Sequence, residues 1–139
     1  MNLPCDERKS SIISNTVVGQ FIVTPDNQKV IEGDSVIFRC KAENNNDDLT
    51  YTWTFNGNPL EPSDRVYQNG SNLHIEMVNK TTDVGEYACI AYSKSTGARE
   101  TTSAARLDVI CKYIIFKFII SFCHLLGRYL NFHQNIRSC

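Results

Sequence analysis

The sequence predicts an all-β fold, a sandwich of two antiparallel sheets, followed by a separate apolar C-terminal segment. Short stretches of alternating apolar and polar residues recur between turn signals, about eight in all, as in an all-β sandwich. Two cysteines, Cys40 and Cys89, lie on either side of Trp53, and Tyr87 stands two residues before the second cysteine. Because a sandwich of this kind needs about 100 residues, the 139-residue chain has room for one domain and additional sequence.

The first half of the domain supplies four predicted strands, within 21–25, 28–34, 35–42 and 50–55. The third and fourth alternate most clearly, and their apolar faces carry Val36, Phe38, Cys40 and Ala42 in one and Tyr51, Trp53 and Phe55 in the other. Asn56-Gly57 is a hairpin turn signal. The polar segment 44–48 is predicted to be a solvated loop, since Asp47 and Asp48 lack the ligand spacing of a calcium loop.

The second half supplies the remaining strands, predicted within 64–68, 73–78, 85–92 and 99–109, the last as one long strand. The turn signals between them are Asn69-Gly70 and the segment 95–97. Tyr87, Cys89 and Ala91 are expected on the inward face of the third of these strands. His74 alternates with Leu73 and Ile75, so its side chain is expected in solvent.

The chain therefore divides into a disordered lead (1–19), a packed domain (20–110) and a tail (111–139). The lead carries Asp6 and Glu7 and has no apolar run long enough for a secretory signal.

Composition excludes several classes of function. The formal net charge is −1, which gives no basic field for nucleic acid. The cysteines and histidines lack zinc spacing, and the scattered His74, His124 and His133 have no nucleophile or orienting carboxylate at a suggestive distance in sequence. The sequence therefore predicts a non-enzymatic protein without catalytic residues, metal, cofactor or small-molecule substrate.

The pattern resembles the intermediate set of the immunoglobulin superfamily. The matching residues are Gly33-Asp34-Ser35-Val36, Cys40, Trp53, Leu73-x-Ile75-x-x-Val78 and Asp83-x-Gly85-x-Tyr87-x-Cys89. The resemblance implies a Cys40–Cys89 disulfide between the sheets with Trp53 packed against it, a Tyr87 hydroxyl bonded to backbone at the preceding corner, and an Arg65–Asp83 salt bridge. The alternative is a pair of free thiols, as in immunoglobulin domains inside muscle cells.

A paired Cys40–Cys89 implies an oxidising compartment, which conflicts with the absence of a signal and favours a fragment of a longer secreted or membrane chain. The other four cysteines lie outside the pattern and their state is left open; they are Cys5, Cys111, Cys123 and Cys139.

A finer resemblance joins residues 64–73 and 95–100, with Ser103-Ala104, to an N-terminal immunoglobulin domain of the receptor family of inactive tyrosine-protein kinase 7 and its insect relative Off-track. It implies an extracellular recognition or adhesion module of a single-pass receptor in Wnt and planar-polarity signalling. The expected partner is a protein at the cell surface, with a second copy as one option. The alternative function is a structural module of an intracellular filament-associated protein.

Two sequons, Asn69-Gly70-Ser71 and Asn79-Lys80-Thr81, are candidates for N-glycosylation. Both fall at strand ends or turns. Asn79 is the stronger candidate, because it lies in an expected exposed loop, whereas Asn69 overlaps a tight turn.

The tail is the most ambiguous segment. Its apolar run, with Lys117 inside it, makes a membrane span through 113–130 marginal. Most residues from Ile110 to Cys139 are Ile, Phe, Lys, Asn or Tyr, whose codons are AT-rich, and this favours translation past an exon boundary. A membrane anchor and a soluble apolar helix are the alternatives.

Overall fold

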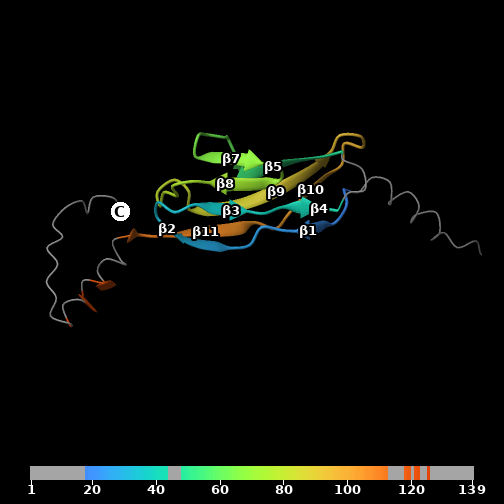
Figure 1. Ribbon diagram of the computed structural model, residues 1–139. Helices are drawn as coiled ribbons and strands as arrows, with labels where there is room; N and C mark the ends of the chain where they lie inside the picture. Colours follow the sequence, from blue (N-terminus) through green and yellow to red (C-terminus); the bar gives the residue numbers. More distant parts are fainter. Residues whose placement is uncertain (1–17, 44–47, 113–117, 120, 123–124, 126–139) are drawn as a thin grey trace, which may run out of the picture.

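The computed structural model describes residues 18–43, 48–112, 118–119, 121–122 and 125. This part contains eleven strands, which form two layers (Figure 1). Their bounds are β1 Phe21–Val23, β2 Gln28–Ile31, β3 Val36–Phe38, β4 Lys41–Ala42, β5 Leu49–Phe55, β6 Asn58–Pro59, β7 Val66–Asn69, β8 Asn72–Ile75, β9 Gly85–Ser93, β10 Arg99–Thr101 and β11 Ala105–Ile110. The all-β prediction is confirmed.

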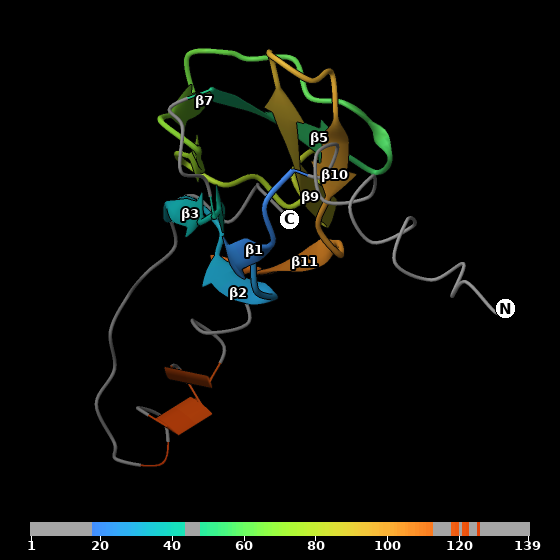
Figure 2. The ribbon, with the colours of Figure 1, turned by 90° about the vertical axis from the view of Figure 1, so that its right-hand side faces the viewer.

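One layer is a sheet with the order β2-β11-β9-β5-β6, in which β10 also pairs with β9. The other layer contains the sheet β3-β8-β7 and the short pair β1-β4. Figure 2 places β3 and β7 on one side of the molecule and β5, β9 and β10 on the other. All pairings are antiparallel except that of β2 with β11. The result is a β-sandwich of two mainly antiparallel layers.

The core lies between the layers: β11 buries alternate residues, as a period of two requires, and β9 buries Tyr87, Cys89 and Ala91 on its inward face. Its largest fully buried side chains surround the disulfide and include Phe38, Leu73, Ile75, Val78 and Leu107. The Phe38 ring stacks on Tyr87 with 4.9 Å between ring centroids and lies 6.2 Å from Trp53. Aromatic contacts of this kind add to the hydrophobic burial that holds the sheets together.

Three predicted strands are broken in the structure, and the prediction of unbroken strands was wrong. The segment 35–42 divides into β3, which pairs with β8, and β4, which pairs with β1. The segment 73–78 ends as a strand at Ile75, since Met77 has a left-handed φ of 47° and turns the chain.

The segment 99–109 divides into β10 and β11. Between them the Thr102 amide donates to the Cys89 carbonyl (2.9 Å), while the Thr102 hydroxyl accepts from the Cys89 amide (3.0 Å). A side chain thus replaces one backbone partner, and the ladder is interrupted there.

Buried residues also lie just outside both ends of the predicted domain. Val18, assigned to the lead, is buried against Ala42 and Ala91; residues 1–17 of the lead lie outside the described residues. Cys111, directly after β11, is buried and disulfide-bonded. The described tail residues from 112 onward have helical geometry. Within the described residues no helix is both long enough and apolar enough to cross a bilayer, and most of 113–130 lies outside them.

Candidate functional site

The predicted pin of the sandwich is present. Cys40 and Cys89 form a disulfide with 6.4 Å between their Cα atoms. Trp53 pairs with Cys89 across β5 and β9, and its indole N–H donates to the Ser71 carbonyl at 3.1 Å. Burying a tryptophan requires a partner for this N–H, and the turn after β7 supplies it. These groups are internal and therefore position the surface rather than form it.

The base of the sandwich holds a second buried network. The Arg65 guanidinium donates to both carboxylate oxygens of Asp83, at 3.0 and 3.2 Å. The Tyr87 hydroxyl donates to the Asp83 carbonyl at 2.8 Å. Burial alone would raise the pKa of Asp83, but hydrogen bonds from Arg65, the Asn79 amide and Thr82 outweigh it and hold this pKa below its ordinary value. Burial, followed by the Asp83 charge, raises the pKa of Tyr87, so its hydroxyl remains a donor.

One outward surface of the sandwich is formed by β5, β9 and β10. Residues paired directly across antiparallel strands share a face, so the registers give two rows on it. One row is Thr50, Tyr92 and Arg99, and the other is Thr52, Ile90 and Thr101. We call this surface, together with Thr54, the threonine face.

The threonine face is nearly uncharged and partly apolar. Tyr92 is 36% exposed and Thr52 is exposed in the middle of β5. Arg99 is its charged member, and the guanidinium carbon lies 6.0 Å from the centre of the Tyr92 ring. The Thr50 and Thr54 hydroxyls donate to carbonyls of β9, at 3.3 and 3.4 Å. Tyrosine and arginine are enriched at protein interfaces, and charged residues are depleted at interface cores, so Tyr92, Arg99 and the low charge of this face favour protein binding.

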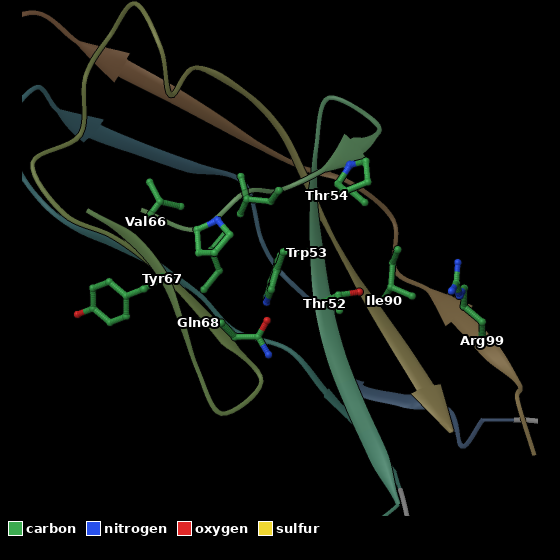
Figure 3. A pocket seen from close by; sticks show the side chains of 12 residues that line it. Thr52, Trp53, Thr54, Val66, Tyr67, Gln68, Ile90 and Arg99 are labelled. Carbon is green, nitrogen blue, oxygen red and sulfur yellow. The ribbon is translucent and has the colours of Figure 1, made fainter. Parts of the chain in front are cut away.

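The face continues into a cleft of about 380 Å³ around the short strand β6 (Figure 3). The cleft lies partly on the outward side of β5, at Thr52 and Thr54, and partly between β5 and β7. Arg99 is the charged residue of its lining; the other lining residues are Trp53, Pro59, Leu60, Pro62, Val66, Tyr67, Gln68, Leu73 and Ile90. It is thus an apolar depression beside the threonine face, with one cation at its border.

The two sheet edges next to this surface differ. At β7, Ser63 forms hydrogen bonds with both backbone groups of Val66. The Ser63 amide donates to the Val66 carbonyl (2.7 Å), and the Ser63 hydroxyl accepts from the Val66 amide (3.1 Å). The Gln68 side chain covers the next gap by donating to the Tyr51 carbonyl at 2.9 Å. By contrast, β10 pairs only with β9 among the described strands, and its three residues are exposed. This edge is therefore open to another strand.

One end of the face is braced by Asp48. Its carboxylate accepts from the Ser93 hydroxyl at 2.8 Å and from the Ser95 amide at 2.9 Å, and it also contacts the Ser95 hydroxyl. Hydrogen bonds from Ser95 and Ser93 lower the pKa of Asp48, so it is ionised at neutral pH. The loop between β9 and β10 is thereby tied to the start of β5.

The predicted site residues fall into separate groups in space. Trp53 lies beside Cys89 of the Cys40–Cys89 disulfide, on the neighbouring strand. Arg65, Asp83 and Tyr87 meet at the base. Asn69 ends β7, and Asn79 lies between β8 and β9. In the described part of the chain no group of three His, Cys, Asp or Glu side chains is arranged to hold a metal ion.

The sequence analysis did not identify the threonine face. A signal for it was present, because Thr50, Thr52 and Thr54 alternate with the core residues of the same strand. Which strands would lie beside them was not readable from that alternation.

Comparison with known proteins identifies the fold and several named relatives. A family model described as an immunoglobulin domain matches residues 20–93. The tyrosine-protein kinase-like otk of Drosophila willistoni is 49% identical over 92 residues, which are 66% of this chain and 9% of that protein. Its namesake in Drosophila melanogaster is 45% identical over 91 residues, again 66% and 9% of the two chains.

Among solved structures, the tandem Ig repeats of Dlar superpose with a TM-score of 0.60 at 24% identity, covering 70% of this chain and 51% of theirs. That likeness shows the fold alone. The chain spans only 9% of the length of the two otk relatives, so their similarity concerns one domain of a much larger protein. The family match, the inter-sheet disulfide and the tyrosine at the corner agree, and the chain belongs to the immunoglobulin domain family.

Proposed function

We propose that this chain is an extracellular protein-recognition module of a cell-surface receptor of the otk type. The observation that carries the proposal is the threonine face: a rigid, nearly uncharged surface bordered by the open edge of β10 and an apolar cleft. Partners would dock flat on this face or add a strand at β10. Immunoglobulin domains generally hold partners and seldom catalyse.

The otk relatives support the receptor context, since they match this domain at 45–49% identity. By analogy with that receptor family, the module would serve adhesion or Wnt and planar-polarity signalling, with a second copy as one candidate partner. The formed disulfide and the otk relatives do not favour the alternative of an intracellular filament module.

The proposal is tested by displaying the complete chain on cells and probing it with an array of purified receptor ectodomains, including a second copy of this chain. We expect at least one ectodomain to bind. Thr52→Arg should abolish that binding, because it places a long charged side chain in the centre of the face while leaving the core unchanged.

The matched control is Lys41→Glu, an equally exposed position on β4 in the opposite layer. It should leave binding intact. Absence of binding to every ectodomain, or binding that survives Thr52→Arg but is lost in Lys41→Glu, would contradict the proposed face.

A further inference from the structure

We propose that Asn79 carries an N-linked oligosaccharide and that the turn around it is built to accept one. The proposal rests on the extracellular location proposed above. It concerns the connection between β8 and β9, which lies outside the threonine face.

The hydrogen bonds of this turn leave one atom of the Asn79 side chain available. The Asn79 Oδ1 accepts from the Thr81 amide at 2.8 Å and from the Thr81 hydroxyl at 2.6 Å. The backbone amide of Asn79 donates to the Asp83 carboxylate at 2.7 Å, and the backbone carbonyl of Asn79 accepts from the backbone amide of Asp83 at 3.0 Å. Among the described contacts the Nδ2 group makes none, so bonding a sugar to it removes no native hydrogen bond.

The chemistry requires the amide nitrogen and leaves the oxygen in place. In the secretory pathway, Nδ2 attacks the anomeric carbon of an oligosaccharide linked to a lipid diphosphate. The bond from that carbon to the diphosphate oxygen breaks, an N-glycosidic bond forms, the lipid diphosphate leaves, and Nδ2 loses one proton. Oδ1 remains a carbonyl oxygen and can still accept both bonds from Thr81.

There is also space for the product. Residues 79–82 are all exposed. Their backbone is held by the buried Asp83, which is paired with Arg65 in the segment just before β7. A glycan at Asn79 therefore projects from an ordered anchor without having to displace a neighbouring strand.

The second sequon lacks this geometry. Asn69 pairs with Asn72 across the tight turn between β7 and β8, where Gly70 has a φ of 62°. The Ser71 carbonyl is held by the Trp53 indole, and no hydrogen bond among the described contacts joins the Ser71 hydroxyl to Asn69. The structure therefore separates two sequons that the motif alone treats alike.

The test is translation of the complete chain into microsomes behind an added signal peptide and a reporter sequon. Only chains with a glycosylated reporter are scored, so every scored chain has entered the lumen. We expect a further oligosaccharide, removable by endoglycosidase, which peptide mass spectrometry places on Asn79. Thr81→Ala should abolish it and Thr81→Ser should retain it, because the serine keeps the hydroxyl. Asn69→Gln should leave it unchanged.

The proposal is overturned if scored chains carry no glycan on Asn79, or if Thr81→Ala leaves that glycan in place. Since the added signal delivers the chain, such a result concerns Asn79 alone. The proposed recognition function would still be decided separately by the ectodomain array.

Discussion

At the scale of single residues, Asp83 does more than any other side chain to organise the base of the domain. Its carboxylate accepts hydrogen bonds from Arg65, just before β7, from the backbone amide of Asn79 and from the Thr82 hydroxyl, while its carbonyl accepts one from the Tyr87 hydroxyl. The side chain is 7% exposed, so each of these bonds acts in a poorly solvated place. One aspartate thus joins a strand, a turn and the corner tyrosine.

Replacing this aspartate should make stability less sensitive to acid. We expect Asp83→Asn to lower the free energy of unfolding at pH 7 by about 2–3 kcal/mol, at the lower end for a broken buried pair because Arg65 is partly exposed. Since the folded pKa of Asp83 lies below its unfolded value of about 3.9, its contribution is present above that pH and is lost as the pH falls through the folded pKa. Urea denaturation at pH 7 and pH 3 should show a smaller difference between variant and wild type at pH 3.

The matched control is Asp108→Asn, which breaks the exposed pair of Arg106 and Asp108. Its effect should stay within about 0.5 kcal/mol, as is usual for a surface ion pair. An Asp83→Asn loss that is no larger than this, or that does not change with pH, would show that the buried pair contributes little.

At the scale of elements, the hairpin of β5 and β6 forms the border of the cleft. Asn56 and Gly57 both have left-handed φ angles, 50° and 79°, as the two-residue hairpin turn requires. The Asn56 side chain then accepts from the Glu86 amide at 2.9 Å, which fastens the turn to β9. Gly85 lies beneath it, where an added Cβ would approach the Phe55 ring to 2.5 Å. The hairpin therefore depends on backbone conformation at one glycine and on space at another.

The backbone requirement can be isolated at Gly57. A Cβ added there meets nothing within 4 Å, so any cost comes from the φ angle alone. We expect Gly57→Ala to destabilise the domain by about 1–2 kcal/mol, the cost of a left-handed alanine. Gly57→Asn should cost clearly less, because asparagine tolerates this conformation. Equal losses in the two variants, measured by thermal unfolding, would rule out the φ explanation.

At the scale of the whole molecule, the disulfide joins the two layers. Cys40, the residue just before β4, is bonded to Cys89 of β9 in the opposite layer. It closes a segment with a sequence separation of 49, which includes both hairpins of the middle of the chain. The threonine face is the outward side of the sheet that this bond fastens. Its flatness therefore depends on the sandwich staying closed.

Removing the bond should weaken the entire sandwich. We expect the double variant Cys40→Ala/Cys89→Ala to lose about 4 kcal/mol, the chain-entropy value for a loop of roughly 50 residues. Guanidinium denaturation of the complete chain measures this loss. A change below about 1 kcal/mol would indicate that Trp53 and the surrounding core hold the sheets without the crosslink.

By itself, the sequence determined the fold class, the residues of the pin and the turn at Asn56-Gly57. The fold class and the turn follow from local signals, because a period of two shows which side chains point inward and a left-handed turn favours Asn and Gly; the pin was implied by the resemblance to immunoglobulin domains. Only the tertiary structure decided that β4 leaves the sheet of β3, that β10 separates from β11, and that Thr52, Ile90 and Thr101 form one row. These features depend on strand register across long sequence separations, where a single buried group such as Thr102 can interrupt a ladder. The tight turn at Asn69 was already readable from the sequence, whereas the anchoring of the Asn79 turn by Asp83 was visible only in the structure.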